Sequence, residues 1–350
     1  MLKYSIKRIL LAFITAFIIL TLTFFLVKLQ GLDKAASSRI SENFAYYNAQ
    51  RIYGNIEMYT EPIEGRKIFD MLVFNNNGIE TVYYYYEVPI TKQYIRWLGK
   101  VVTEWDWGKS AVIEPNSPAI SIIAQRLPVS VSVNIVAVFV SVPLGILLGI
   151  FAGLKKNTWI DHTISTLVMV FISVPSFVII IFLIYLLGYN GNLPSMWPTP
   201  DQPTSVKVLA YIIPVMSLSF GSICGYTRFV RAELCEVMSS EYLLLARTKG
   251  LTKNQAITRH ALRNAFVPIL PSILAEFIGV FSGSMILERL YQIPGIGDLY
   301  IRAVNRNKPD YNVLLVDMAI FTIVGLLAGI VLDLSYGFID PRIRMGEKNG

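Results

Sequence analysis

The sequence has little charge. Only 16% of its 350 residues are Asp, Glu, Lys or Arg, whereas a soluble domain averages about 25%. Apolar residues make up 54% of the chain, and a net charge of +7 on so apolar a chain does not indicate a nucleic-acid partner. This composition excludes a disordered chain and an ordinary soluble domain. It indicates a protein that crosses the membrane several times.

Cysteine and histidine are also scarce. The two cysteines, Cys224 and Cys235, are too few for a disulfide scaffold. The two histidines, His162 and His260, cannot by themselves supply a typical zinc site. We therefore expect neither a disulfide-stabilised fold nor a metal centre.

Catalytic motifs are missing as well, since neither His-Glu-x-x-His nor Gly-x-Ser-x-Gly occurs. Gly108-Lys109-Ser110 resembles the end of a P-loop, but the glycine required five residues earlier is replaced by Thr103. Gly295-Ile296-Gly297-Asp298 matches the Gly-x-Gly-Asp signature of aspartyl intramembrane proteases. That chemistry needs a second carboxylate nearby, such as Asp317 or Asp333. We expect no catalytic residue, and intramembrane proteolysis is kept as an alternative.

Six apolar runs are long enough to cross a membrane as helices, which takes about 20 residues each. They are residues 9–27, 127–154, 163–187, 208–227, 264–287 and 311–332. The first run is longer than the apolar core of a signal peptide, which has about 7–15 residues, so we interpret it as a retained helix. The sequence predicts an all-α polytopic membrane protein with six transmembrane helices.

Basic residues predict the orientation, because they concentrate on the cytoplasmic side. The basic residues before the first run, after the second, after the fourth and after the sixth all fall on one side. Both termini are therefore predicted to be cytoplasmic. One loop, between the fifth and sixth runs, contradicts this arrangement with four basic residues: Arg289, Arg302, Arg306 and Lys308.

The only long polar stretch, residues 30–126, is predicted to form an extracytoplasmic α/β insertion between helices 1 and 2. Residues 68–74 and 79–88 are rich in β-formers and flank an Asn-Asn-Asn-Gly turn, which predicts a hairpin. The tyrosines at 83–86 would form a packed surface or a contact surface for an extracytoplasmic partner. Three tryptophans are expected to anchor the stretch at the membrane interface: Trp97, Trp105 and Trp107.

The polar stretch between the fourth and fifth runs is patterned rather than irregular. Four residues recur at helical spacing: Glu241, Leu244, Leu245 and Thr248. Gly250 supplies a helix stop, and a second short helix is expected from Lys253 to about Ala265. Two short helices joined at a glycine indicate a docking element for a cytoplasmic partner.

Polar and small residues inside the apolar runs are further candidates. Ionisable residues within membranes usually face a bundle interior or an aqueous path. Such residues, taken either as structural pairs or as the lining of a translocation path, are Asn134, Glu276 and Asp317. Glycines at small-xxx-small spacing predict close packing within the subunit or, alternatively, contact with a second subunit: Gly145, Gly149 and Gly153.

The patterned stretch resembles the EAA loop of ABC-importer permeases, with Glu241, Ala246 and Gly250 at the motif positions. More closely, the chain is similar to the B-type subunit of the oligopeptide/dipeptide/nickel permease family. The matching segments are Thr227-Arg-Phe-Val-Arg231, residues 241–251 and 260–265, Trp107-Gly-Lys-Ser110, Arg126-Leu-Pro128, Glu288 with Pro294-Gly-Ile-Gly297, and Asp340-Pro-Arg-Ile-Arg344. The chain departs from the family at Gln30-Gly-Leu-Asp-Lys34, which is only partly like the usual Pro-Gly-Asp-Pro, and in a longer outer loop.

The resemblance implies a type I ABC-importer permease fold and a mechanism of alternating access. The chain would pair with a second permease and two ATPases, which bind the ATP and Mg, so no cofactor is expected in this chain. An extracytoplasmic binding lipoprotein would deliver the solute. Oligopeptides are expected first, with dipeptides, nickel chelates, glutathione or signalling peptides as alternatives. The residues implied in ATPase coupling are Ser239, Ser240, Glu241, Tyr242, Leu245, Ala246, Lys249 and Gly250.

The predicted organisation has four parts in a bacterial cell membrane. These are an N-terminal helix at 1–29, the insertion at 30–126, a five-helix core at 127–338 with its coupling loop at about 228–265, and a cytoplasmic tail at 339–350. An ion-coupled secondary transporter that uses Glu276 and Asp317 is the alternative from another class.

Overall fold

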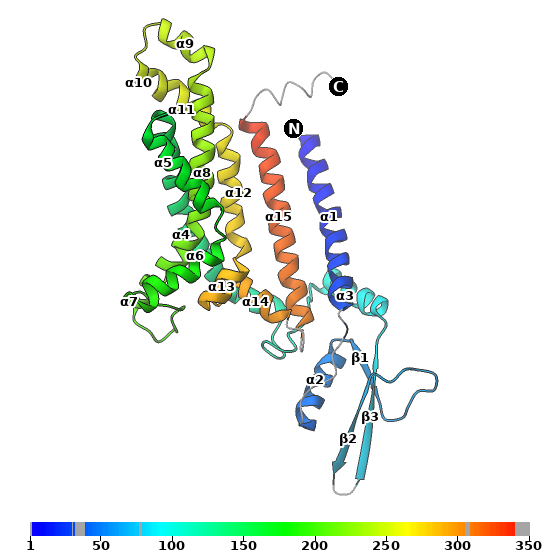
Figure 1. Ribbon diagram of the computed structural model, residues 1–350. Helices are drawn as coiled ribbons and strands as arrows, with labels where there is room; N and C mark the ends of the chain where they lie inside the picture. The colour runs from blue at the N-terminus through cyan, green and yellow to red at the C-terminus, as the bar shows by residue number, and fades with distance from the viewer. Residues whose placement is uncertain (1, 30, 32–38, 77–78, 305–308, 340–350) are drawn as a thin grey trace. The chain divides into compact units, whose positions relative to one another are not determined.

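The computed structural model describes residues 2–29, 31, 39–76, 79–304 and 309–339 (Figure 1). These residues form two units, the first from 1–12, 127–298 and 324–350, the second from 13–126 and 299–323. Most described residues are helical, and the strands gather in one small sheet, so the predicted fold class is confirmed. Several predicted features lie outside the described residues: the Asp340–Arg344 motif and the tail from 340, Arg306, Lys308, Asn77, Gly78, and Gln30 with residues 32–34.

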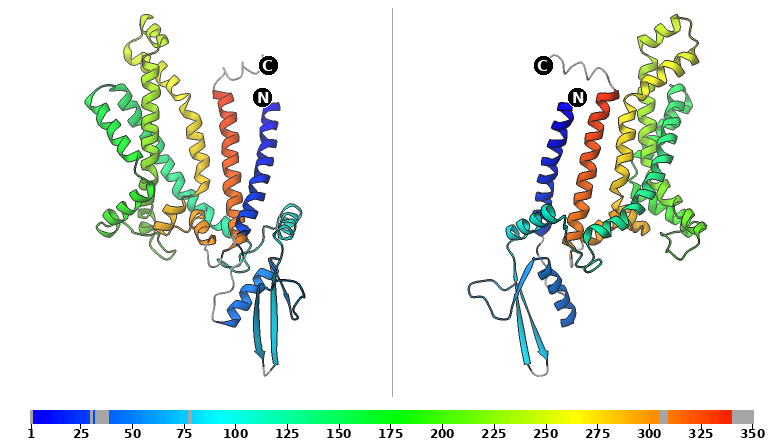
Figure 2. Two further views of the ribbon diagram at one scale, coloured as in Figure 1. Left: turned by 45° about the vertical axis from the view of Figure 1, so that its right-hand side comes forward. Right: turned by 180° about the vertical axis from the view of Figure 1, so that it is seen from behind.

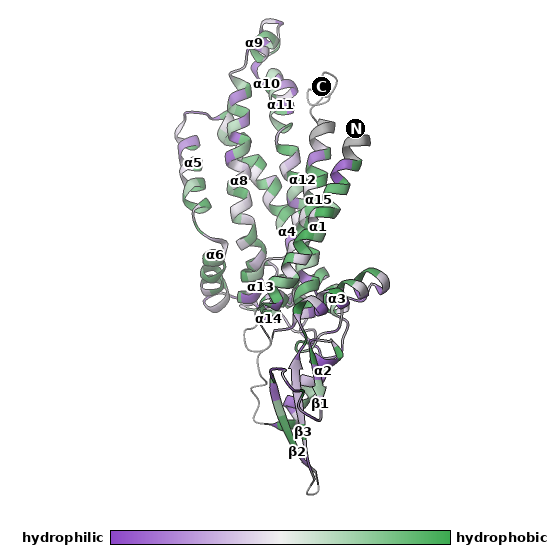
Figure 3. Ribbon diagram, turned by 90° about the vertical axis from the view of Figure 1, so that its right-hand side faces the viewer, coloured by the Kyte–Doolittle hydropathy of each residue, from purple (hydrophilic) through white to green (hydrophobic). Residues whose placement is uncertain are grey.

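Four helical segments are long and apolar enough to cross a membrane, as the hydrophobic colouring in Figure 3 illustrates. They are α1 (Leu2–Lys28), α4 (Ala119–Leu154), α7 (Thr204–Leu209) together with α8 (Ile212–Met238), and α15 (Tyr311–Ile339). Two bent pairs would raise the number to six. The first joins α5 (Trp159–Ile172) to α6 (Ser176–Leu183) and the π-helical η1 (Ile184–Tyr189). The second joins the helical segment 253–266 to α12 (Ile269–Gly279) and η3 (Val280–Ser282), with a bend of 52°. The count of six stays a prediction.

The third apolar run, predicted as one span over 163–187, is divided into two helices. The chain bends by 95° between α5 and α6, at Ser173 to Pro175. Proline has no backbone N–H and disfavours helical geometry in the residue before it, so the helix ends there. The fifth run also ends early, because Gly283 adopts a positive φ of 64° before α13 (Met285–Tyr291) begins.

Helices α4 and α8 pack closely in the first unit. A Cβ atom on Gly145 would lie 2.9 Å from the carbonyl oxygen of Ile223, and one on Gly149 would lie 2.8 Å from that of Thr227. The Thr227 hydroxyl donates a hydrogen bond of 3.2 Å to the Gly145 carbonyl. The interpretation of these glycines as packing within the subunit is confirmed. Since α8 covers that face, a second subunit cannot use it.

The second unit contains an antiparallel sheet in the order β1-β3-β2, with α2 (Ile40–Ile52) beside it (Figure 1). The strands are β1 (Ile56–Tyr59), β2 (Asp70–Asn76) and β3 (Ile79–Glu87), and pairing of Asn76 with Ile79 confirms the predicted hairpin. Tyr85 and Tyr86 are fully buried, and Tyr85 packs in a cluster with Tyr46 and Tyr47 of α2. The interpretation as a packed surface is therefore confirmed for these two tyrosines.

Candidate functional site

The first candidate site lies beyond the end of α8. We call residues 239–266 the elbow, and Figure 2 shows it projecting from the end of α8. It consists of α9 (Glu241–Thr248), α10 (Lys253–Ala256), the π-helical η2 (Ile257–Ala261) and α11 (Leu262–Phe266).

Local sequence signals explain the two arms of the elbow, of which α9 is the first and the helical segment 253–266 is the second. Gly250 has a φ of +94°, a left-handed conformation that favours glycine, and it ends α9. Thr252 and Gln255 form a capping box that begins α10. Both short helices predicted from the sequence are thus confirmed as helices.

The elbow has a small apolar core of its own. Leu243 of α9 packs with Leu234 of α8 and with Ala256 and Ile257 of the second arm. The neighbouring apolar side chains of α9 do not join this core, because Leu244 is 63% exposed and Leu245 is 57% exposed. The core therefore holds the elbow in an ordered shape and leaves an apolar surface on its outside.

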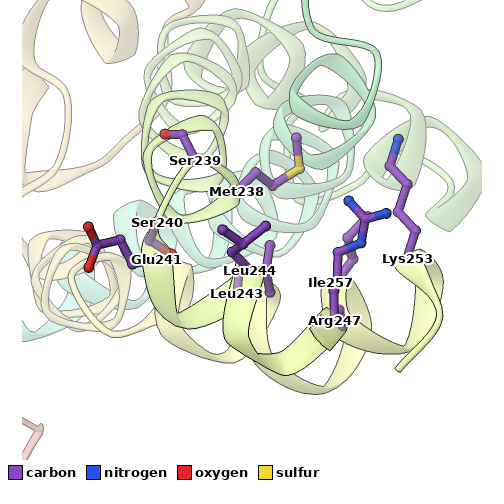
Figure 4. Close-up of a pocket in the computed structure, with 10 residues that line it drawn as sticks. Met238, Ser239, Ser240, Glu241, Leu243, Leu244, Arg247, Lys253 and Ile257 are labelled. Carbon is purple, nitrogen blue, oxygen red and sulfur yellow. The ribbon is translucent and has the colours of Figure 1, made fainter. Parts of the chain in front are cut away.

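A hollow of about 230 Å³ opens on the elbow. Figure 4 shows Glu241 at one side of it and Arg247 with Lys253 at the other. Of the coupling residues implied by the resemblance, the structure places three in its lining: Ser239, Ser240 and Glu241. The other five lie on α9 or directly after it, outside the lining: Tyr242, Leu245, Ala246, Lys249 and Gly250. The implied set omits Leu244 and Arg247, which also line the hollow.

A second hollow, of about 330 Å³, lies among α4, α8 and α12. Asn134 and Glu276 both line it, together with Ser141. The Asn134 amide donates a hydrogen bond of 2.9 Å to the Val280 carbonyl, and the Ser141 hydroxyl lies 3.4 Å from a Glu276 carboxylate oxygen. Asp317 is fully buried on α15 in the other unit and is not in the lining.

The Thr227–Arg231 motif connects α8 to two neighbouring helices. The Thr227 hydroxyl bonds to α4, as described above. The Arg231 guanidinium forms a two-pronged ion pair with the buried Asp161 of α5, at 2.5 and 2.8 Å. Such paired hydrogen bonds fix geometry as well as charge, so the motif is explained by packing.

The Gly-x-Gly-Asp fragment surrounds a buried carboxylate, an arrangement we call the Glu288 clasp. One Glu288 oxygen accepts hydrogen bonds from the N–H groups of Gly297 at 2.8 Å and Asp298 at 3.1 Å, and the other accepts one from Ser284 at 3.2 Å. A Cβ atom on Gly295 would lie 2.3 Å from this carboxylate. Burial raises the pKa of Glu288, while the hydrogen bonds from the Ser130 hydroxyl and from the N–H donors oppose that rise.

Asp298 itself is buried and pairs with Arg289 at 3.1 Å. One of the basic residues that contradict the predicted orientation is therefore neutralised. Asp333, the other carboxylate of the protease alternative in this unit, pairs with Arg8 at 2.9 Å. Both aspartates thus have structural ion pairs.

The Gly-Lys-Ser fragment forms a similar arrangement in the second unit, the Asp310 clasp. The Ser110 hydroxyl donates a hydrogen bond of 2.6 Å to an oxygen of the buried Asp310. The same oxygen accepts bonds from three successive N–H groups at 3.0 to 3.2 Å, those of Ala111, Val112 and Ile113. Successive N–H groups of this kind bind anions, and here the anion is the protein's own carboxylate.

Comparison with known proteins identifies the family. Residues 145–345 match the family described as "Binding-protein-dependent transport system inner membrane component". The dipeptide transport system permease protein DppB of Lactococcus lactis is 32% identical over 347 residues, which cover 99% of this chain and 100% of that protein. The oligopeptide transport system permease protein OppB of Escherichia coli is 31% identical over 358 residues, which cover 98% and 100%.

A crystal structure of an amino acid ABC transporter resembles 62% of this chain and 94% of its own, at 20% identity and a TM-score of 0.48. That resemblance is too distant to bear on function. The family match, in contrast, spans more than half of this chain, and the relatives align with it from end to end. The chain therefore belongs to the binding-protein-dependent transport system inner membrane components, which are multi-pass permease subunits and not enzymes.

Proposed function

We propose that this chain is a permease subunit of an ATP-driven peptide importer. Support comes from its relatives, which are named for dipeptide and oligopeptide transport. Oligopeptides are the proposed solute, and dipeptides, nickel chelates and glutathione are the alternatives. The ATP and Mg are bound by the partner ATPases, and this chain binds no cofactor.

The proposed assembly contains a second permease, two ATPases and an extracytoplasmic binding lipoprotein. Both termini lie in the cytoplasm, so the elbow is cytoplasmic and the insertion at 30–126 is extracytoplasmic. The core at 127–338 forms the transport pathway with the second permease. Asn134 and Glu276 line this path, and Asp317 is proposed as a third residue of it.

The exposed apolar surface of α9 is the observation that carries the coupling proposal. Leu244 and Leu245 are exposed on a helix that is itself held by a buried core. Burying a leucine side chain stabilises an assembly by about 1.5–3 kcal/mol. In the proposed coupling, α9 enters a groove of an ATPase, where the leucines are buried and Glu241, Tyr242 and Lys249 set the register.

Paired substitutions test this coupling. Leu244→Asp with Leu245→Asp should weaken ATPase association by about a hundredfold or more, because each leucine accounts for about 1.5 kcal/mol or more. Leu244→Met with Leu245→Met keeps the surface apolar and serves as the matched control. The measurement is co-purification of the ATPases in mild detergent, with melting temperature as the check on folding. Full ATPase recovery with the aspartate variant would refute the proposed surface.

A separate measurement decides between ATP and an ion gradient. Uptake of a labelled oligopeptide in cells should stop when ATP is depleted and persist when the proton gradient is collapsed. The opposite pattern would favour the ion-coupled transporter, in which Glu276 and Asp317 carry the ion.

A further inference from the structure

Helix α3 (Ile90–Glu104), which the transport mechanism leaves without a role, has three distinct faces. One face packs into the second unit, with Gln93 and Val101 buried and Trp97 half-buried. A second face is apolar yet exposed, with Ile95 at 69% and Val102 at 73%. The third is a basic stripe at every fourth residue: Lys92, Arg96 and Lys100. The Lys100 ammonium lies 4.0 Å from the Asp106 carboxylate, and the Lys100 side chain stays half exposed.

The position of α3 is set by contacts with α1, a helix long and apolar enough to span the membrane. The hydroxyls of Tyr94 and Thr21 lie 2.8 Å apart, and the Phe24 ring packs on Tyr94 and Trp97 at centroid distances of 5.4 and 5.0 Å. Phe24 lies four residues before the end of α1, which is about 6 Å along the helix axis. Figures 1 and 3 show α3 running across this end of α1.

A spanning helix that ends at Lys28 has the boundary between hydrocarbon and headgroups near its last turns. Around the circumference of α3, the exposed apolar face lies next to the face that contacts α1. The basic stripe lies on the other side of the apolar face. Helices of this kind lie in the plane of the membrane surface, with the apolar side about 5–10 Å deep and the cations at the anionic phosphates. Trp105, which ends α3 in a left-handed conformation and is 67% exposed, is a residue type enriched at that depth.

We propose that α3 is a membrane-surface helix. Its face with Ile95 and Val102 inserts into the leaflet at the Lys28 end of α1, and its basic stripe binds the phosphates of anionic phospholipids. The occupant of the exposed face is thus lipid. The reasons are its continuity with the end of a spanning helix and the match between the stripe and negatively charged headgroups. The anchor holds the segment between the sheet and α4 at the membrane.

Spin labels on the full chain in lipid nanodiscs test the proposal. Val102→Cys places a label on the inserted face, and Lys92→Cys places a matched label on the same helix outside it. The parent chain, whose two cysteines are buried, controls for background labelling. The label at 102 should be severalfold more accessible to oxygen than to an aqueous nickel chelate, and the label at 92 should show the reverse. Ready access of nickel at 102 would overturn the proposal. Exclusion of both reagents there would also overturn it, because a protein would then cover the face.

Lipid composition tests the basic stripe separately. Adding phosphatidylglycerol to phosphatidylcholine nanodiscs should raise the oxygen-to-nickel ratio at 102. Lys92→Gln with Lys100→Gln should abolish that rise. Arg96 is left in place, because its guanidinium packs against Gly54. An equal ratio in both lipids for the unsubstituted stripe would overturn the role of the cations.

Discussion

The Asp310 clasp and the Glu288 clasp hold a buried carboxylate in the same way but differ in the sequence distance that they span. Asp310 accepts hydrogen bonds from residues about 200 positions away, whereas the backbone N–H groups that bond to Glu288 lie 4 to 10 positions away and the Ser130 hydroxyl reaches it from α4. The first connects the start of α15 to the chain before α4, and the second shapes one turn between α13 and α14 (Ile296–Ala303). The backbone donors therefore connect distant segments in the Asp310 clasp and shape a local turn in the Glu288 clasp, to which α4 adds one side-chain contact.

The structures of the two clasps also explain why the Gly-Lys-Ser and Gly-x-Gly-Asp fragments resemble enzyme motifs. A P-loop holds phosphate with successive backbone N–H groups, and the residues after Gly-Lys-Ser form such a cradle for Asp310. Gly-x-Gly-Asp is glycine-rich for another reason. A side chain at Gly295 would occupy the space of the Glu288 carboxylate. A short motif typical of an anion-binding loop can thus form such a loop around a carboxylate of the same protein.

The largest effect is expected for Asp310→Ala. The substitution leaves three N–H groups and the Ser110 hydroxyl without their acceptor, and each buried unsatisfied group costs about 1–3 kcal/mol. Thermal unfolding of the purified full chain in detergent should show that the free energy of unfolding falls by several kcal/mol, or that the chain does not fold. Asp201→Ala, at an exposed aspartate, is the control. Asp310→Asn, which keeps one acceptor oxygen, should fall between them, and an Asp310→Ala chain as stable as the control would refute the clasp.

A smaller loss is expected for Gly295→Ala in the local clasp. The added methyl group would lie 2.2 Å from the Ser130 hydroxyl and 2.3 Å from the Glu288 carboxylate, so both must move. Overpacking of this kind costs about 1–3 kcal/mol. Gly279→Ala adds the same atom where nothing lies within 4 Å and serves as the control. Equal melting temperatures for the two variants would contradict this prediction, because the turn would then accommodate the methyl group without loss of stability.

The finest comparison uses one serine from each clasp. Ser110 donates to Asp310 and accepts a bond of 2.9 Å from the Glu114 N–H, and Ser130 bonds to the Glu288 carboxylate and accepts one of 2.9 Å from the Ile296 N–H. Each serine thus makes two hydrogen bonds, so Ser110→Ala and Ser130→Ala should lower the free energy of unfolding by similar amounts, about 1 kcal/mol for each bond lost. The denaturant midpoints of the two variants measure these losses. A clearly larger loss for one variant would show that its clasp depends more strongly on the serine.

Features that depend on neighbouring residues could be predicted from the sequence. The Asn-Asn-Asn-Gly turn between β-forming runs specifies a hairpin, and Gly250 between two helical patterns specifies the elbow. Pro175 also marks the bend between α5 and α6, whereas the uniform hydropathy of that run does not show how large the bend is. Apolar periodicity reports burial in lipid or protein alike, so it does not distinguish one straight span from two angled pieces.

Features that depend on distant residues could not be predicted. Nothing in the residues around Ser110 indicates that Asp310 fills its cradle, because the pairing is set by the fold of the whole unit. In the same way, the exposed Leu244 and the buried Leu243 are adjacent and chemically identical in the sequence. Only the packing of α9 on the second arm of the elbow distinguishes them.

Helix α8 has a mechanical consequence. It is one uninterrupted helix of 27 residues, about 40 Å long. Leu218 and Ser222 on it line the hollow of Asn134 and Glu276, and its far end leads directly into Ser239 of the elbow. The contacts of Gly145 and Gly149 with α8 bring the backbones of α4 and α8 close together along this stretch. In the proposed coupling, a displacement of the elbow would therefore reach the hollow through one continuous helix, with no loop between them.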